Sequence, residues 1–248
     1  MRVAVSGAAG RMGSLVADAV RRAADLELAG LFDPSTDGGR GVSADPEVIR
    51  GADVVVEFSV PDVVMANLER WRRTGVHAVV GTSGFTAGRM EELRSLWGSG
   101  PPNCLIAPNF SIGAVVMMRF AELAAPHFSA AEVIELHHDR KADAPSGTAM
   151  NTAERIAGAN PNQQRHVEST ELVDGARGAT VGGVPVHSIR LPGLLAHQEV
   201  LFGSEGESLT IRHDTTDRAS FMPGVLLAVR NVAHLPGVTL GIETLLGI

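Results

Sequence analysis

The chain has 248 residues, of which 44% are hydrophobic and 20% are charged, and this composition excludes disordered, collagen-like and disulfide-rich proteins. Its formal net charge of −7 and the lack of a long basic run argue against a nucleic-acid binder. No apolar stretch reaches the roughly 18 residues of a transmembrane helix, so no membrane partner is expected, and the single cysteine, Cys104, fits a reducing cytoplasm and an inert buried thiol.

Short apolar runs alternate with helical patterns in the first part of the chain. Met1 leads straight into the first run, which indicates a strand rather than a signal peptide. The predicted strands are Arg2–Ser6, Glu27–Phe32, Val54–Phe58, His77–Val80 and Cys104–Ala107. Helices are predicted for the stripe Met12, Leu15, Val16, Ala19, Val20 and Ala23, for a segment that starts at Pro61 and runs through Leu68 and Trp71, and for Ala87–Trp97. Nearly continuous apolar strands separated by helices predict a doubly wound parallel sheet of the Rossmann type.

The pattern changes after Pro108. The next predicted elements are a helix at Ala114–His127, a strand at Ala131–His138, a helix at Gly147–Ala157 and a surface loop at Gly158–Gln164. Three strands follow at Val184–Leu191, Gln198–Phe202 and Ser208–Asp214, and their glycine-containing turns favour antiparallel pairing. A helix at Phe221–His234 and a strand at Val238–Ile242 come last. We therefore expect an α/β domain at 1–110, to which 218–248 return, and an α+β domain with a mixed or antiparallel sheet at 111–217.

A glycine-rich loop, Ser6-Gly7-Ala8-Ala9-Gly10-Arg11-Met12-Gly13, lies between the first strand and the first helix. Gly7 permits a tight turn, Gly10 lets the backbone approach a pyrophosphate, and Gly13 lets the helix pack closely on the sheet. The start of the helix favours the phosphate anion. Asp33 ends the second strand 20 residues after Gly13, where it can accept hydrogen bonds from an adenosine ribose. The motif predicts dinucleotide binding, against the simpler alternatives of a strand–helix turn and of a turn-forming Asp33.

Charge near the ribose bears on the choice of dinucleotide. The carboxylate of Asp33 repels a 2′-phosphate and favours NADH, whereas Arg11 is a nearby cation that offsets this repulsion. Two further loops follow the carboxyl ends of strands, Gly81-Thr82-Ser83-Gly84 and Ala107-Pro108-Asn109-Phe110-Ser111. Their small and hydroxyl-bearing residues suit a nicotinamide ribose and carboxamide, and they equally suit ordinary turns.

The most distinctive segment is Glu135-Leu136-His137-His138-Asp139-Arg140-Lys141-Ala142-Asp143-Ala144-Pro145-Ser146-Gly147-Thr148-Ala149. It places histidine, arginine and lysine just before a helix whose first amide groups form an anion site. Lys141 and a histidine add donors for a carboxylate, and either can move a proton. The segment predicts binding of an anionic substrate and its protonation during reduction, with a solvated loop as the alternative.

A metal site competes with this interpretation. His137 and His138 are neighbours on a strand and point to opposite faces, and no second histidine or cysteine lies at chelate spacing, so we predict no metal. Surface or satisfied core positions are expected for the other histidines, which are His77, His127, His166, His187, His197, His213 and His234.

These motifs resemble those of the dihydrodipicolinate reductase family. The segment 135–149 is similar to the family signature E-x-H-H-x-x-K-x-D-A-P-S-G-T-A, and the loops at Val5–Gly13, Gly81–Phe85 and Ala107–Gly113 resemble three further family loops. The resemblance spans essentially the whole chain. One departure is that Asp33 is followed by Pro34, where some relatives carry an arginine suited to a 2′-phosphate.

The resemblance implies a reaction, a cofactor and an assembly. The reaction is the reduction of (2S,4S)-4-hydroxy-2,3,4,5-tetrahydrodipicolinate, a cyclic imine dicarboxylate, to tetrahydrodipicolinate with loss of water, in the diaminopimelate route to lysine. NADH or NADPH, or both, would deliver the hydride. The implied assembly is a homotetramer built by the middle domain, and the two domains imply a hinge that closes on the substrate.

The resemblance also implies roles for residues. His137 is the implied acid/base, and Lys141 is its partner proton donor. The implied substrate-binding residues are His138, Lys141, Ser146, Gly147 and Thr148. The implied dinucleotide-binding residues are Gly7, Ala8, Ala9, Gly10, Arg11, Met12, Asp33, Gly81, Thr82, Ser83, Ala107, Pro108, Asn109 and Phe110. The alternatives are another Rossmann-type imine or amino-acid dehydrogenase and an NAD(H)-sensing regulator without catalysis.

Overall fold

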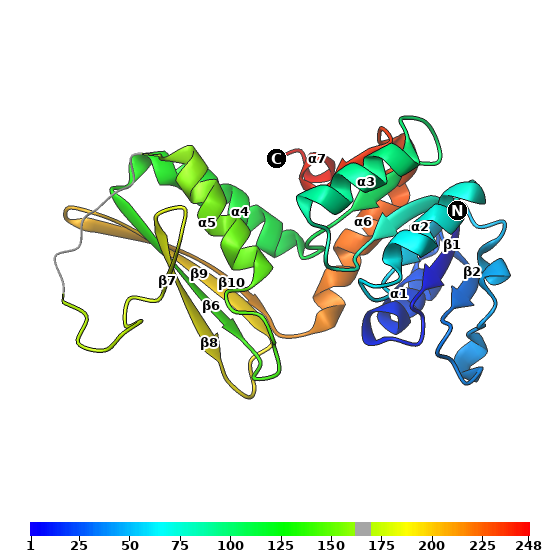
Figure 1. Ribbon diagram of the computed structural model, residues 1–248, viewed down its shortest axis with the longest axis horizontal. Coiled ribbons are helices and arrows are strands. Elements are labelled where there is room, and N and C mark those ends of the chain that lie inside the picture. The colour runs from blue at the N-terminus through cyan, green and yellow to red at the C-terminus, as the bar shows by residue number, and fades with distance from the viewer. Residues whose placement is uncertain (162–169) are drawn as a thin grey trace. The chain divides into compact units, whose positions relative to one another are not determined.

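The computed structural model describes residues 1–161 and 170–248, and the chain divides into two units (Figure 1). Unit 1 comprises Met1–Ile112 and Phe221–Ile248, and unit 2 comprises Gly113–Ser220. Within the described ranges, no helix combines the length and the apolar character needed to cross a membrane.

A six-stranded parallel sheet forms the centre of unit 1. Its strands are β1 (Arg2–Ser6), β2 (Glu27–Phe32), β3 (Val54–Glu57), β4 (His77–Val80), β5 (Cys104–Ile106) and β11 (Val238–Leu240). They pair in the order β11-β5-β4-β3-β1-β2, and each of these pairs is parallel. The strand order reverses at β1, which lies between β2 and β3, and the carboxyl ends of strands at such a switch point bind ligands.

Helices pack on the sheet of unit 1 and bury it. They are α1 (Arg11–Arg22), α2 (Val64–Arg73), α3 (Ala87–Trp97), α6 (Met222–Asn231) and α7 (Glu243–Leu246), with 3-10 turns at Gly39–Gly41, Pro46–Ile49 and Val232–His234. Leu68 and Trp71 of α2 share a core with Leu93 of α3 and with one side of the sheet, while α1 and α6 pack together. Consecutive valines of β3 are fully buried, as expected for a strand covered on both faces.

Unit 2 is built on a five-stranded mixed sheet. Its strands are β6 (Ala130–His137), β7 (Ala179–Val181), β8 (Val184–Arg190), β9 (Ala196–Ser204) and β10 (Glu207–Thr215), in the order β10-β9-β6-β8-β7. β6 runs parallel to β8, and the other neighbours are antiparallel. The helices are α4 (Ile112–Ala124) and α5 (Gly147–Ala159), with 3-10 turns at Ala125–His127 and Arg218–Phe221. Ala121 of α4 and Ile156 of α5 pack against Val133 of β6 in the core of the unit.

The predicted fold class is confirmed, with a parallel sheet of the Rossmann type and a second, mixed sheet. One predicted helix start is wrong. Pro61 lies in a turn, and α2 begins at Val64, because the amides of Val63 and Val64 both bond to the carbonyl of Val60 and close that turn first.

The expected antiparallel arrangement of the last three strands is also wrong for β8. Only β9 and β10 pair with each other, whereas β8 pairs in parallel with β6 and in antiparallel with the short strand β7, which the sequence did not predict. In the sheet, β6 lies between β8 and β9. The glycine-containing turn that connects β8 to β9 along the chain therefore joins two strands that are not neighbours.

Several helix ends differ from the predictions. α5 extends to Ala159, so Gly158 is helical, and the rest of the predicted loop at Gly158–Gln164 lies partly outside the described residues, as does His166. The predicted helix at Ala114–His127 ends at Ala124 and continues as a 3-10 turn, because Pro126 lacks the amide that an α-helix needs. The predicted helix Phe221–His234 is likewise α6 between two 3-10 turns.

Candidate active site

The glycine loop joins β1 to α1 at the switch point of unit 1. Gly7 has φ +77°, and a side chain there would also bring a Cβ atom within 2.5 Å of the carbonyl oxygen of Phe58. A Cβ atom on Gly13 would lie 2.1 Å from the carbonyl oxygen of Gly7. Both positions therefore require glycine, and the first turn of α1 crosses the loop at backbone contact distance.

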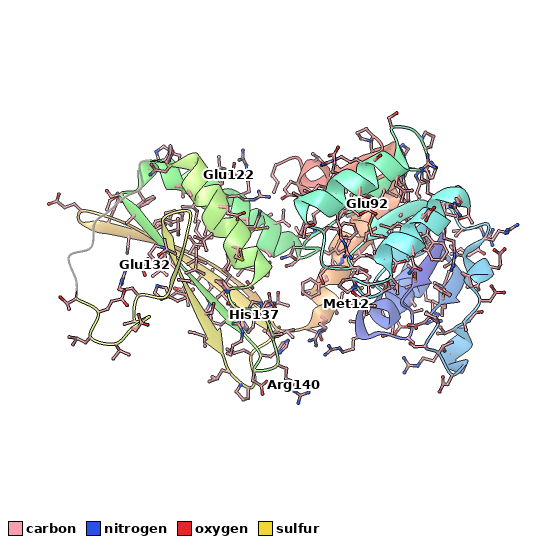
Figure 2. All side chains as sticks on the ribbon, in the orientation of Figure 1. Met12, Glu92, Glu122, Glu132, His137 and Arg140 are labelled. Atoms are coloured by element: carbon pink, nitrogen blue, oxygen red, sulfur yellow. The ribbon has the colours of Figure 1, made fainter. Side chains whose placement is uncertain are left out.

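The N-terminus of α1 suits an anion. Gly10 is the N-cap and carries no side chain to bond the first amides, and the first turn holds no acidic residue. Ala9, Gly10 and Arg11 are exposed, Met12 is half-buried and Ala8 is buried. Figure 2 labels Met12 in this first turn of α1. The unpaired first-turn amides and the helix dipole are the features that bind a phosphate group. The loop therefore fits the pyrophosphate of a dinucleotide.

Asp33 is attached to this loop from the end of β2. Its Oδ2 accepts a hydrogen bond from the Ala9 amide at 3.1 Å, and its Oδ1 accepts bonds from the amide and hydroxyl of Ser35 at 3.0 and 2.6 Å. The carboxylate is almost fully buried. These bonds hold an acidic group beside the glycine loop, which is where a dinucleotide presents its adenosine ribose.

The other predicted dinucleotide loops leave the same edge of the sheet. Thr82 follows β4, and its hydroxyl bonds to the carbonyls of Glu57 and Ser59 at 3.3 Å each. A Cβ atom on Gly81 would lie 2.2 Å from the ring of Phe58, whose ring centroid lies 5.7 Å from that of Phe110. Because β1, β3, β4 and β5 are parallel, the four following loops lie at one end of the sheet, and these contacts join three of them. Ser83, Ala107, Pro108 and Asn109 belong to the same loops.

The loop after β3 also lies at this end of the sheet and was not predicted from the sequence as part of the site. The side chain of Glu57 is fully buried at the end of β3, where Oε1 accepts the Ser59 amide at 3.0 Å and Oε2 accepts the Trp71 indole N–H at 2.8 Å. These bonds fix Phe58 and Ser59 next to Gly7. The sequence offered one signal for this loop, its position after the carboxyl end of a predicted parallel strand, where ligands bind in such sheets.

In unit 2, His137 ends β6 with Glu135 on the same side of the strand. Residues two apart on a strand share a face, and here that face packs on α5. The Nδ1 atom of His137 is hydrogen-bonded to Oε2 of Glu135, whose side chain has no exposed surface. Figure 2 marks His137 in unit 2.

Further donors reach the carboxylate of Glu135. Arg190 of β8 donates from Nη1 at 2.9 Å and from Nη2 at 2.7 Å, and the amide of Ser146 donates at 3.2 Å. Burial alone raises the pKa of Glu135, but hydrogen bonds from His137, Arg190 and Ser188 outweigh it and hold that pKa at about 2. Glu135 is therefore a carboxylate at neutral pH.

Lys141 lies in the loop between β6 and α5, and it is the only lysine of the chain. Its Nζ donates to both carboxylate oxygens of Asp143, at 2.7 and 2.9 Å, and this ammonium holds the pKa of Asp143 below its usual value. The amide of Lys141 bonds to the carbonyl of His138, which closes the turn after the strand. Arg140, in the same turn, is exposed (Figure 2).

The N-terminus of α5 directly follows the loop that carries Lys141. Ser146 is the N-cap: its hydroxyl accepts the Ala149 amide at 3.2 Å, while its own amide donates to Glu135. Both polar groups of Ser146 are thus engaged inside the protein. Gly147 is exposed and Thr148 half-buried, and both lie in the first turn of α5. Together with Lys141, this helix start can hold a carboxylate.

The structure brings His137, Lys141, Ser146, Gly147 and Thr148 into one region of unit 2. It adds Glu135 and Arg190, to which the sequence reasoning gave no role. Side chains alternate between the two faces of β6, and this alternation was enough to predict that Glu135 lies on the same face as His137. Arg190 is 55 residues away in sequence and reaches Glu135 only because β8 pairs in parallel with β6.

Other titratable groups lie outside this region. Within residues 1–161 and 170–248, no cluster of three or more histidine, cysteine, aspartate or glutamate side chains could hold a metal ion. Cys104 is fully buried, and burial raises the pKa of its thiol. His187 and His197 pair with Glu132 and Asp214, and His77 accepts the Asn103 amide.

Comparison with known proteins gives matches over the whole chain. Residues 1–110 match the family model described as dihydrodipicolinate reductase, N-terminus, and residues 113–246 match the model for the C-terminus of the same family. The 4-hydroxy-tetrahydrodipicolinate reductase of Mycobacterium marinum is 54% identical over 250 residues, with 100% of each chain covered, and that of Nocardia farcinica is 53% identical over 99% of this chain and 98% of the relative.

A solved structure shares the architecture. A dihydrodipicolinate reductase from Paenisporosarcina sp. TG-14, with dipicolinate bound, superposes with a TM-score of 0.84 at 38% identity and covers 98% of both chains. A probable dehydrogenase from Thermotoga maritima superposes with a TM-score of 0.63 at 14% identity, which shows a shared fold alone. These matches confirm the resemblance found in the sequence motifs.

Proposed function

The chain belongs to the dihydrodipicolinate reductase family, and from this we propose that His137 and Lys141 perform the acid–base chemistry of the reaction. It is an NAD(P)H-dependent oxidoreductase that reduces 4-hydroxy-tetrahydrodipicolinate, like the relatives of that name at 53–54% identity. The observation that supports the residue assignment is the arrangement of His137, Glu135 and Lys141 at the start of α5.

Unit 1 is the proposed dinucleotide-binding part. When bound, the reduced nicotinamide supplies a hydride, and the protein supplies orientation and electrostatics. The pyrophosphate would lie on the loop from Gly7 to Met12 and the adenosine ribose against Asp33. Gly81–Ser83 and Ala107–Phe110 would line the nicotinamide end. The glycine contacts described above support this assignment, because Gly7 and Gly13 let the loop and the first turn of α1 pack at backbone contact distance, as the dinucleotide-binding fingerprint requires.

Unit 2 is the proposed substrate-binding part. The first-turn amides of Gly147 and Thr148, with the Lys141 ammonium, would fix one substrate carboxylate, and Asp143 holds that ammonium until a carboxylate replaces it. His138 would add a donor, and Ser146 acts as the cap that keeps the amides in place. His137 has Nδ1 bonded to Glu135, so Nε2 is the atom that holds or releases the proton for the reduced ring.

Assembly and location follow the family expectation. We propose a homotetramer in which unit 2 forms the contacts between chains, with light scattering as the measurement. Leu172 and Val173 of unit 2 are 92% and 72% exposed, which supports an apolar contact there. The single buried thiol supports a cytoplasmic location.

A coupled assay tests the function. The substrate is made in situ by condensation of pyruvate with aspartate semialdehyde, and NADH absorbance is followed. We expect loss of absorbance that depends on both precursors and on this protein. An amino-acid dehydrogenase would show no such loss but would reduce NAD with an amino acid, and a sensor without catalysis would bind NADH with no turnover. Either result contradicts the proposal.

We predict a preference for NADH. The buried carboxylate of Asp33 lies beside the ribose site and opposes a 2′-phosphate, whereas the exposed Arg11 attracts it. A net difference of ~0.5–1 kcal/mol, the size of an exposed charge interaction, corresponds to kcat/KM for NADH that is about two- to fivefold higher than for NADPH. Arg11→Gln should lower kcat/KM for NADPH and leave that for NADH unchanged. Arg22→Gln, at the other end of α1, is the matched control. A strong preference of the unmodified protein for NADPH would show that the cation outweighs Asp33.

A further inference from the structure

Glu135 is buried behind His137, and each of its carboxylate oxygens is bonded to more than one donor. Oε2 faces Nδ1 of His137 and Nη1 of Arg190, and Oε1 faces Nη2 of Arg190 and the Ser146 amide. A buried carboxylate is stable only when its charge is paired and its lone pairs are satisfied, and both conditions are met here. The side chain has no exposed surface, so it cannot itself contact a substrate.

The charge of Glu135 determines the tautomer of His137. A carboxylate only accepts hydrogen bonds, so Nδ1 of the imidazole must carry its proton toward Glu135. In the neutral ring, Nε2 is then the unprotonated atom, and in the cation Nε2 carries the proton that can be transferred. An imidazole in the opposite tautomer would present the wrong atom to a substrate.

Arg190 extends this arrangement to the loop that carries Lys141. The Nη2 atom that bonds to Glu135 also donates to the carbonyl of Asp143 at 2.6 Å, and Asp143 is the residue whose carboxylate pairs with Lys141. The Ser146 amide also donates to Glu135, and Ser146 is the N-cap residue of α5. One carboxylate and one guanidinium therefore connect the histidine, the lysine loop and the helix start.

We propose that Glu135 and Arg190 are positioning residues for the reduction. Glu135 fixes the ring orientation and tautomer of His137. Arg190 holds Glu135 and the loop that carries Lys141 in place next to the start of α5. The proposal rests on the proposed role of His137. Neither residue has a role in the predictions from sequence.

The same sheet contains an internal comparison. Glu132, also on β6 but facing the other side of the sheet, bonds to His187 of β8 and to Arg177. The composition of this second cluster is the same, but it is partly exposed and makes no bond to the start of α5. A second glutamate–histidine–arginine cluster, on the opposite face of the sheet from α5, is therefore available in the same chain as a matched control.

The test is a double-mutant cycle on kcat. Glu135→Gln is expected to lower kcat by about 10- to 100-fold, because an amide can donate to Nδ1 and allow the wrong tautomer, and acid–base groups contribute about 10²–10⁴-fold. KM for NADH should not change. In the His137→Gln background, Glu135→Gln should cause little further loss, since its effect passes through the ring. Glu135→Asp should recover part of the loss, and Glu132→Gln should keep kcat within twofold.

The outcomes separate this proposal from the proposed function. If His137→Gln has near-normal turnover, the role of His137 itself is wrong. If His137→Gln is impaired but Glu135→Gln is not, or if the two losses multiply in the double variant, positioning by Glu135 is wrong. For Arg190, replacement by lysine keeps a charge but loses the two-pronged contact, and we expect kcat to fall with it. An unchanged kcat would remove Arg190 from the proposal.

A spectroscopic measurement keeps the proposal testable if Glu135→Gln does not fold. In protein labelled with ¹⁵N-histidine, two-bond ¹H–¹⁵N spectra distinguish the two ring tautomers, and the His137 signal is the one missing from His137→Gln. We expect the neutral ring of His137 to carry its proton on Nδ1. A ring protonated on Nε2 alone would overturn the assignment of Glu135.

Discussion

Replacing His137 by glutamine is expected to lower kcat by about 10²–10⁴-fold, the usual contribution of a general acid or base. The Nε2 atom of the imidazole can accept or donate a proton, whereas glutamine has a similar size but cannot act as an acid or base. Affinity for NADH should stay nearly intact, because the proposed dinucleotide residues belong to unit 1. Steady-state kinetics and a fluorescence titration with NADH measure the two effects.

Lys141→Ala should reduce turnover to a similar extent, again with NADH binding retained. Lys141→Arg separates the two roles of the side chain, since a guanidinium still pairs with a carboxylate but is effectively never deprotonated. His187→Gln is the control for the histidine, because His187 also pairs with a glutamate of β6 but on the other side of the sheet. Near-normal turnover in both His137→Gln and Lys141→Ala would disprove the assignment.

Gly13→Ala is expected to have the second large effect, this time on the dinucleotide. The new Cβ atom would lie 2.1 Å from the Gly7 carbonyl oxygen and 2.8 Å from the Ala8 Cα atom, and neither backbone atom can move without opening the loop. We expect the dissociation constant for NADH to rise by at least about 100-fold and stability to fall by about 1–3 kcal/mol, as for other overpacked sites. Isothermal titration and thermal unfolding measure these changes.

Gly88→Ala provides the matched comparison. Gly88 lies in the first turn of α3, and a Cβ atom there meets only the hydroxyl of Thr86 at 4.0 Å. Alanine favours a helix over glycine by up to about 1 kcal/mol, so stability should be equal or slightly higher and NADH affinity unchanged. Normal NADH affinity in Gly13→Ala would mean that the loop adapts at low cost and that the close crossing is not required.

The parallel sheet of unit 1 could be predicted from the sequence because each strand is a short apolar run, and because each helix between strands carries apolar residues at helical spacing. The three-residue strand β7 could not, because Ala179–Val181 is too short to show alternation. The pairing of β8 also escaped prediction. A turn after β8 favours a hairpin locally, whereas the long-range pairing with β6 depends on burial of Val133 and Val186 against α5.

The candidate site shows the same division between local and long-range information. The signature segment contains His137, Lys141 and the cap of α5 in sequence order, so these could be predicted together. Glu135 could have been assigned from strand alternation, since residues two apart share a face. Arg190 could not, because its proximity to Glu135 follows from the strand register in which His137 lies opposite Arg190.

The presence of only one lysine in the chain has a practical consequence. Reagents that acylate or reductively alkylate amines have one side-chain target, Lys141, besides the N-terminal amine. Once the signal of the N-terminal amine is assigned, the one remaining isotope-labelled methyl signal would report on this loop without any mutation. Following the remaining activity while such a reagent is titrated would show directly whether a free amine on Lys141 is needed for turnover.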